Sequence, residues 1–235
     1  MSSLSPRLTV GDIVSEPLLA HNIGTRRERR NRAAECLEPV GLRTDALDRY
    51  PHELSGGQRQ RIGIARALVV RPKLVVCDEP VSALDVSVRS QILNLLADLR
   101  AQLRLSMLFI GHDLAVVRQV CDRIGVMYLG RLLEVSDTTG LFESPLHPYT
   151  QVLLSSIPLA NPDVQRHRSR LAMVGDSSVP PRPSSGCRFS GRCPYGVGAE
   201  DPTVPEFVEA APHHHVEACR CVSSDAAKAF RPHGD

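Results

Sequence analysis

The residues best suited to chemistry are a serine and two glycines that begin a predicted helix. The run comprises Ser55, Gly56, Gly57 and Gln58. The helix is predicted to reach about Val70, because Pro72 follows shortly afterwards. A serine N-cap followed by glycines leaves backbone N–H groups free at the positive end of the helix dipole, with no side chain to block an anion. This helix start is therefore predicted to bind phosphate.

Two adjacent carboxylates follow a predicted buried strand. Leu74–Cys77 is apolar and rich in β-branched residues, as expected of a parallel strand, and Asp78 and Glu79 come directly after it. Ligands of open α/β sheets bind at the carboxyl ends of the strands. An aspartate there suits a nucleotide-bound Mg²⁺, and a glutamate suits a base that orients water.

Four motifs in this region resemble those of ATP-binding-cassette (ABC) ATPases. Leu54–Gln58 is similar to the signature motif of that family, and Leu74–Glu79 to its Walker B strand. Ser82–Asp85 resembles the D-loop, and Gly111–Asp113 resembles the switch-histidine loop. The alternative, a glycine turn, a core strand and a surface histidine, does not account for four motifs in the family's order.

The resemblance implies a nucleotide site shared by two cassettes that face each other head to tail. In the family, the P-loop of one cassette and the signature motif of the other hold the same ATP. Ser55, Gly57 and Gln58 would then contact the γ-phosphate of a nucleotide bound to a partner chain. Gly56 belongs to the same helix start, and Asp85 would couple the two sites across the dimer.

The resemblance also implies which residues hydrolyse ATP. Asp78 would hold Mg²⁺, Glu79 would polarise the attacking water, and His112 would contact the γ-phosphate in line with it. Hydrolysis would then depend on positioning and on charge stabilisation, as in other phosphoryl-transfer sites.

A P-loop of the Gly-Lys-Ser/Thr type does not occur in the 235 residues. The two lysines are Lys73 and Lys228, and neither follows glycine. Ser2–Val10 resembles the segment just after the glutamine loop of the family, so the chain is expected to begin within the domain. A truncated gene, a late start codon and a split protein would each explain this. We expect no ATPase activity from the chain by itself.

Composition places the chain among ordinary globular proteins. Hydrophobic residues make up 42% and charged residues 23%, with a net charge of +2. This balance and the aromatic content of 4% give no case for a nucleic-acid partner. No apolar run approaches the roughly 18 residues that span a bilayer, and the N-terminus lacks a signal-peptide core. A cytoplasmic location is therefore expected, with membrane association only through partners.

The N-terminal part is predicted to be helical. An apolar segment over residues 10–19 is expected to be broken by Pro17. Thr25 and Glu28 form a capping box for a helix that reaches about Val40. The resemblance places the apolar segment on the helical subdomain of an ABC ATPase, near the surface where membrane subunits dock.

Alternating strand and helix patterns after the signature motif predict an α/β fold. Apolar residues recur at helical spacing over Val88–Leu103, and Ser106–Ile110 is a second predicted buried strand. A helix over Leu114–Val120 and a hairpin around Gly130 follow. We expect a partial ABC ATPase domain of the P-loop NTPase type, with a largely parallel sheet and a helical subdomain. A small irregular extension that contains cysteines completes the predicted fold.

The C-terminal region narrows the resemblance. Ser144–Pro158 and Gly186–Tyr195 look like the extension of dipeptide and oligopeptide import ATPases, which nickel and glutathione importers share. The predicted division is residues 1–142 for the partial ATPase domain and 143–235 for the extension.

Four cysteines of the extension form a candidate metal site. They are Cys187, Cys193, Cys219 and Cys221. In a cytosolic protein such a group is more often a metal site than a set of disulfides. Four thiolates suit a four-iron cluster or zinc, and proteins resembling this extension can carry an iron–sulfur cluster. A further cysteine of the family pattern is replaced by Glu200, for which Cys221 is a candidate substitute. Free thiols are the alternative.

The resemblance implies an ATP-binding subunit of a peptide-type importer, with ATP and Mg²⁺ as cofactors. It would dimerise with a like or identical subunit, dock on two transmembrane permeases at the cytoplasmic face of the plasma membrane, and serve an extracytoplasmic solute-binding protein. Nickel and glutathione are alternative solutes. The rival functions are a non-catalytic half-cassette that lends its signature motif to another ATPase, and a metal-binding regulatory fragment.

Overall fold

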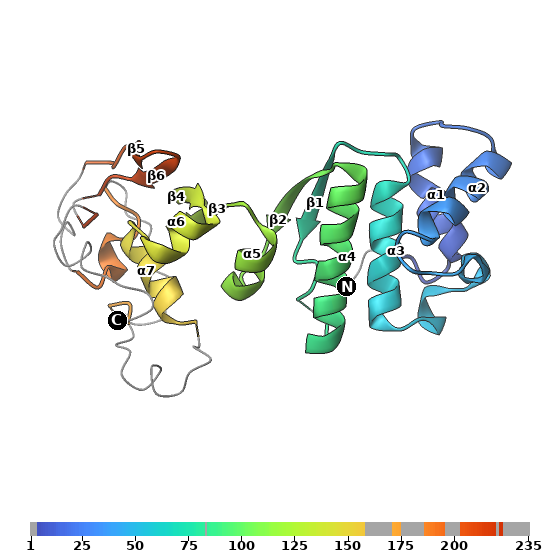
Figure 1. The fold of residues 1–235 in the computed structure, drawn as a ribbon, viewed down its shortest axis with the longest axis horizontal. Helices are drawn as coiled ribbons and strands as arrows, with labels where there is room; N and C mark the ends of the chain where they lie inside the picture. The colour runs from blue at the N-terminus through green and yellow to red at the C-terminus, as the bar shows by residue number, and fades with distance from the viewer. Residues whose placement is uncertain are drawn as a thin grey trace. The chain divides into compact units, whose positions relative to one another are not determined.

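The computed structural model describes residues 4–82, 84–157, 171–174, 186–195, 203–219 and 221–222. The chain divides into two compact units, Met1–His112 and Asp113–Asp235 (Figure 1). The predicted boundary between residues 142 and 143 falls inside the second unit and stays a prediction. Within the described part, no helix is both long enough and apolar enough to cross a membrane.

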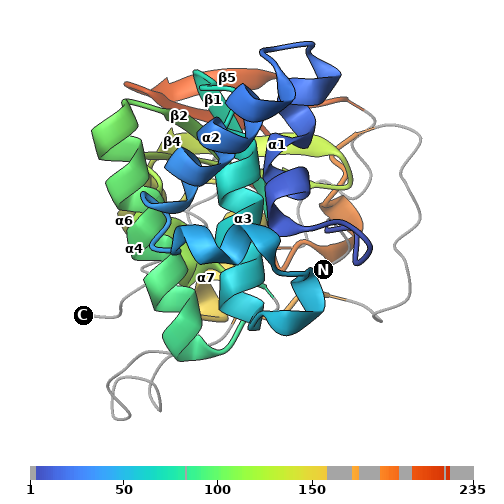
Figure 2. The same cartoon turned by 90° about the vertical axis from the view of Figure 1, so that its right-hand side faces the viewer.

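Three α-helices form most of the core of the first unit. They are α1 Val10–Ala20, α2 Arg26–Leu37 and α3 Gly56–Leu68, joined by the short 3₁₀ turns η1 Thr44–Asp48 and η2 Pro51–Glu53. Ile13, Leu37 and Ile62, one from each helix, are fully or almost fully buried in one apolar cluster. Figures 1 and 2 show α3 between the α1–α2 pair and α4 (Val86–Leu103). The start of α3 is thus held by packing on two sides.

The apolar segment at the N-terminus is helical through Pro17, so the expectation that this proline breaks it was wrong. Ile13 and Val14 before the proline and Leu18 after it are all buried against α2 and α3. This burial outweighs the loss of one backbone hydrogen bond, because most helix stability in proteins comes from packing an amphipathic face. The capping box of α2 is confirmed: Thr25 N donates to Glu28 Oε2 at 2.6 Å, and Glu28 N donates to Thr25 Oγ1 at 3.4 Å.

A pair of parallel strands completes the first unit. Strand β1 (Leu74–Asp78) pairs with β2 (Ser106–Ile110) from Leu74 opposite Ser106 to Asp78 opposite Ile110. Helix α4 connects them, as parallel pairing requires a crossover, and buries Ile92, Leu96 and Leu99. The two strands end together, so the residues that follow them meet at one edge of the pair.

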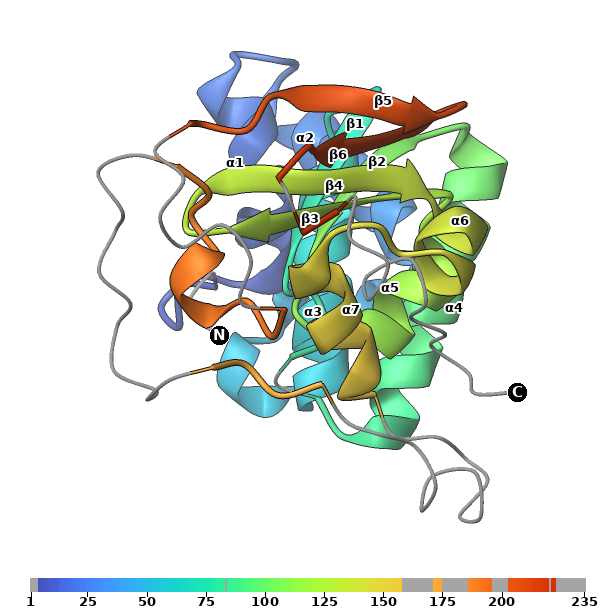
Figure 3. The same ribbon diagram turned by 90° about the vertical axis from the view of Figure 1, so that its left-hand side faces the viewer.

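The second unit is built on an antiparallel sheet. Its elements are α5 Leu114–Val120, β3 Arg123–Tyr128, β4 Arg131–Asp137, α6 Thr138–Glu143, α7 Pro148–Ser155, η3 Ser190–Arg192, β5 Phe207–Ala211 and β6 His214–Glu217. The strand order is β3-β4-β6-β5 (Figure 3). The predicted hairpin turns at Leu129 and Gly130, both with positive φ, which matches the right-handed twist of paired strands.

The α/β fold class is confirmed, with two differences in detail. Among the described strands only β1 and β2 pair in parallel, whereas the other sheet is antiparallel, so the expected largely parallel sheet is limited to this one pair. The extension is also less irregular than expected, since β5 and β6 add to the β3–β4 hairpin. Pairing between β4 and β6 joins residues about 80 positions apart, which local sequence patterns do not reveal.

Candidate functional site

The start of α3 is an exposed helix N-terminus with two free donors. Ser55 N donates to Gln58 Oε1 at 2.9 Å, and Gln58 N donates to Ser55 Oγ at 3.2 Å. This capping box occupies two of the four N–H groups that a helix start leaves unpaired. Within the described residues, the N–H groups of Gly56 and Gly57 have no acceptor. An anion at this helix start would be bound by the two glycine N–H groups.

Gly56 and Gly57 differ in what surrounds them. A Cβ at Gly57 would stand 2.8 Å from Val88 Cγ1, whereas a Cβ at Gly56 would stand 3.8 Å from Leu84 Cδ2. Gly57 therefore allows the first turn of α4 to approach α3 closely, in addition to any role toward phosphate. Gly56 has room for a side chain.

The close approach at Gly57 predicts opposite effects for two alanine substitutions within α3. Gly57→Ala is expected to destabilise the first unit by about 1–3 kcal/mol, because the methyl group overpacks against Val88. A Cβ at Gly63 would meet nothing within 4 Å. Gly63→Ala is therefore expected to stabilise the first unit by about 0.5–1 kcal/mol, because alanine is more stable than glycine in a helix interior. Urea unfolding followed by circular dichroism measures both, and Val88→Ala should restore the Gly57→Ala loss. Equal stability of the two glycine variants would contradict the close packing.

The ends of β1 and β2 bring a carboxylate and an imidazole together. Glu79 N donates to Ile110 O at 2.9 Å and so extends the strand pairing by one residue. Glu79 then has a φ of +45°, which is rare outside glycine. His112 Nδ1 lies 3.0 Å from Glu79 Oε1, with 75% of the histidine and 50% of the glutamate side chain exposed. A side-chain contact this exposed adds little stability, so its value lies in presenting both groups to solvent.

Asp78 and Asp85 lie on either side of Glu79 along the chain. Asp78 is exposed at the last position of β1. Asp85 is the N-cap residue of α4, yet its carboxylate makes no capping hydrogen bond. Both carboxylates are exposed to solvent, and their roles toward a cation and a partner chain stay predictions.

The cysteines of the extension gather in one apolar cluster with aromatic side chains. Cys193, Cys219 and Cys221 are buried there, and Cys187 packs against them half-buried. The sulfur atoms of Cys193 and Cys221 are 3.3 Å apart. The second unit thus brings together all four cysteines that the sequence singled out. Glu200 lies outside the described residues.

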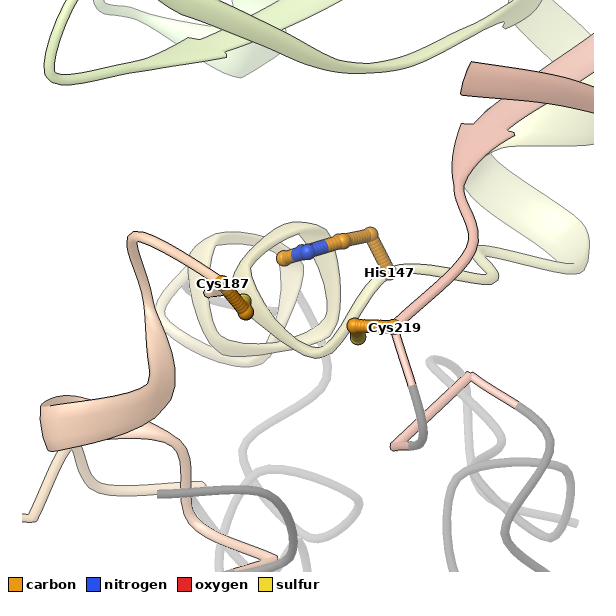
Figure 4. Close-up of side chains that lie close together, drawn as sticks. All are labelled: His147, Cys187 and Cys219. Atoms are coloured by element: carbon orange, nitrogen blue, oxygen red, sulfur yellow. The ribbon is translucent and has the colours of Figure 1, made fainter. Parts of the chain in front are cut away.

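His147 joins the cysteine cluster, and sequence reasoning missed it. A ring nitrogen of His147 and the sulfur atoms of Cys187 and Cys219 lie within 4.8 Å of one another (Figure 4). Ligand atoms around a single tetrahedral zinc ion, with bonds of about 2.0–2.3 Å, stand roughly 3.5–3.8 Å apart. The two sulfur atoms therefore fit a thiolate-bound metal after small side-chain movements, with the imidazole next to them. The one sequence signal was a histidine just before Pro148, at the start of a predicted helix.

A buried carboxylate fixes the backbone at His147. Glu134, which is fully buried, accepts hydrogen bonds from Leu146 N at 2.7 Å and His147 N at 3.0 Å. His214 Nε2 lies 2.7 Å from the same carboxylate. These three contacts tie the start of α7 to β4 and β6, and so hold His147 beside the cysteines.

Cys187 and Cys219 have opposite pKa shifts. The pKa of the Cys187 thiol is raised because it donates a hydrogen bond to Cys219 and is removed from water. The pKa of Cys219 is lowered by that same hydrogen bond, which outweighs its burial. Of these two thiols, Cys219 therefore has the lower pKa. On β6, burial also raises the pKa of Glu217.

Comparison with known families defines the class of protein. The family described as "ABC transporter" matches residues 1–82, and the family "Oligopeptide/dipeptide transporter, C-terminal region" matches residues 133–199. Two solved structures of the ATP-binding cassette MJ0796 share the fold. The dimeric post-hydrolysis state bound to ADP and Pi is 33% identical with a TM-score of 0.51, covering 59% of this chain and 61% of that one. The second dimer is 34% identical with a TM-score of 0.50, covering 57% and 59%. The chain belongs to the ABC ATPases.

Within that class, the relatives are peptide-importer subunits, and the chain belongs with them. A Brucella ovis protein named for peptide import and ATP binding is 52% identical over 218 residues, or 93% of this chain and 68% of the relative. The oligopeptide transport ATP-binding proteins AppF of Bacillus subtilis and OppF of Escherichia coli are 49% and 45% identical. Both matches cover 94% of this chain, and they cover 67% of AppF and 66% of OppF. The chain thus spans about two thirds of these relatives.

Proposed function

We propose that this chain acts in an importer of dipeptides or oligopeptides as a nucleotide-binding subunit that completes an ATP site held by a second cassette. The observation that carries the proposal is the exposed start of α3, where Gly56 and Gly57 present two N–H groups without acceptors in the described structure. The relatives named for oligopeptide transport and ATP binding support the cofactor and the class of solute.

The geometry suits recognition of a terminal phosphate. Two adjacent N–H groups at the positive end of a 13-residue helix attract an anion. The Ser55 hydroxyl accepts from Gln58 N and still has its own hydrogen to donate to a phosphate oxygen. Gln58 is engaged in the capping box, so its contribution is to fix the helix start. The P-loop would come from the partner cassette.

The exposed pair of Glu79 and His112 would serve a P-loop placed on the β1–β2 strands. Leu74, Val76, Leu108 and Ile110 are 46–56% exposed and lie on one face of that pair. Such an apolar sheet face is normally covered, which supports a segment outside these 235 residues packing there with its P-loop. Glu79 would then orient the attacking water, His112 would contact the γ-phosphate, and Asp78 would bind Mg²⁺.

The remaining partners follow from the class. Asp85 would contact the facing cassette at the start of α4. The subunit would lie at the cytoplasmic face of the plasma membrane against two transmembrane permeases, which receive solute from an extracytoplasmic binding protein. Nickel or glutathione would be alternative cargoes, distinguished by uptake assays with each solute.

A mixing experiment tests the proposed function. The chain by itself is expected to release no phosphate from ATP in a malachite-green assay. Added to a cassette of the same importer that carries a Gly-Lys-Ser/Thr loop, it should raise phosphate release above that of the cassette by itself. Turnover by the isolated chain, lost in Glu79→Gln, would contradict the need for a partner; no gain on mixing would contradict the shared site.

Glu79→Gln also separates the two roles open to this chain. If the chain only lends its signature motif, the gain on mixing survives the substitution, since the partner's own glutamate orients the water at that site. We expect this result for the 235 residues. Supplying a P-loop segment that packs on β1–β2 should make turnover depend on Glu79, with a loss of about 10²–10⁴-fold in Glu79→Gln. The exposed Glu35→Gln serves as the control.

A further inference from the structure

The cysteine cluster of the second unit contains a histidine, His147, whose role lies outside the transport function. His147, Cys187 and Cys219 converge from the start of α7, the segment before η3 and the segment after β6 (Figure 4). Each belongs to a different part of the chain, and each is buried or half-buried. Two thiols beside an imidazole suit a soft metal ion, and the hydrogen bonds of the imidazole indicate its role there.

The hydrogen bond at Nδ1 fixes the tautomer of His147. His147 is the N-cap residue of α7, and its Nδ1 accepts a hydrogen bond from Tyr149 N at 3.1 Å. A neutral imidazole that accepts at Nδ1 carries its proton at Nε2. Binding a metal at Nε2 would move that proton to Nδ1, where it would face the Tyr149 N–H. The observed capping geometry therefore excludes His147 as a ligand through Nε2.

The Nε2–H group then needs an acceptor. His147 is fully buried, and within the described structure Nε2 makes no hydrogen bond of standard geometry. A buried donor without an acceptor is costly. A neutral thiol is a weak acceptor, whereas a thiolate is a strong one, because hydrogen bonds to ionised groups are roughly twice as strong.

Backbone hydrogen bonds fix the two cysteines in place. Val222 N donates to Cys219 O at 3.0 Å, and Ser190 N donates to Cys187 O at 3.1 Å. The two sulfur atoms are therefore held beside His147. A donor there would affect metal-bound thiolates, whose properties depend on hydrogen bonds to the sulfur atoms.

We propose that His147 is an Nε2–H donor to metal-bound thiolates at Cys187 and Cys219, and is not itself a metal ligand. The bound group is a soft, thiolate-binding metal centre, to which Cys193 and Cys221 lie close enough to contribute. The imidazole positions and polarises the sulfurs, and Glu134 holds the backbone of His147 in place through His147 N.

Two substitutions at His147 separate its functions. Asparagine places an acceptor near the position of Nδ1 and is itself a preferred N-cap residue, so His147→Asn keeps the cap and loses the Nε2–H donor. Glutamine reaches further, so His147→Gln keeps an N–H donor near Nε2 and loses the cap. His21→Ala, at an exposed histidine of the first unit, is the control.

The test is a Co²⁺ titration of the reduced full chain, followed by thiolate-to-cobalt charge-transfer absorption. Cys187→Ser and Cys219→Ser should lose the absorption. His147→Asn should keep it, with a shifted band and an affinity about 10–100-fold lower. His147→Gln should bind Co²⁺ nearly as tightly as the wild type but melt at a lower temperature. No Co²⁺ binding by the wild type, or complete loss of binding in His147→Asn with its fold intact, would overturn the proposal.

A second measurement is independent of metal. Long-range ¹H–¹⁵N spectra of the full chain report the tautomer of each histidine. His147 should give the pattern of an Nε2–H imidazole both with and without Co²⁺. An Nδ1–H pattern in the metal-loaded chain would show that His147 is a ligand and would overturn the proposal.

Discussion

Replacing Gly56 by aspartate is expected to lower the phosphate release gained on mixing with a P-loop-bearing cassette by about 100-fold or more. The new carboxylate would lie beside the N–H groups of Gly56 and Gly57 and repel the γ-phosphate. The variant should fold, because a Cβ at residue 56 has room beside Leu84 and an acidic residue in the first turn of a helix is favourable. The assay compares phosphate release with and without this chain.

Gly56→Ala is the matched control for that experiment. It adds the same Cβ without the charge, so it should keep most of the gain on mixing. Equal losses in the alanine and aspartate variants would attribute the effect to shape. Full activity of Gly56→Asp would show that the start of α3 does not contact the nucleotide, and the proposed function would then lose its main support.

The parts of the molecule governed by local rules were predictable from sequence. Ser55 is the expected N-cap residue of α3, and Thr25 and Glu28 form the expected capping box of α2, because both motifs depend only on residues up to three positions apart. Strands β1 and β2 and the turn at Gly130 also follow local patterns of apolar and turn residues. The four motifs then indicated the family, which the comparisons confirmed.

The packing around these motifs was not predictable in the same way. The sequence explained Gly57 by room for a phosphate, whereas the structure adds a packing reason, because a Cβ at Gly57 would stand only 2.8 Å from Val88 Cγ1. Both reasons favour glycine, so the residue type could not distinguish them. The distance to α4 depends on the tertiary structure.

Long-range partners account for what was missed in the second unit. His147 lies 40 residues before Cys187, and Glu134 lies 80 residues before His214. Their proximity arises from the pairing of β4 with β6 and from the aromatic cluster around Phe189. No spacing rule links these residues, whereas cysteines attract attention by their type. The thiols of the candidate metal site were therefore predictable from the sequence, and the imidazole beside them was not.

Glu134→Ala is expected to lower the free energy of unfolding of the second unit by about 3–5 kcal/mol. The fully buried carboxylate pairs with His214 at 2.7 Å and accepts from Leu146 N and His147 N. Removing it leaves the imidazole and two backbone N–H groups buried without their acceptor. Urea unfolding, read out by hydrogen exchange of the amides in β4 and β6, measures the loss in this unit.

The control for that substitution is Glu143→Ala, at an exposed glutamate that ends α6, which should change stability by less than about 0.5 kcal/mol. Glu134→Gln keeps an amide oxygen that can accept from a backbone N–H but loses the charge, so an intermediate loss is expected. Because Glu134 also holds the backbone of His147, Glu134→Ala should weaken Co²⁺ binding as well. Wild-type stability in Glu134→Ala would mean that these contacts do not form in solution, and the positioning of His147 would need another explanation.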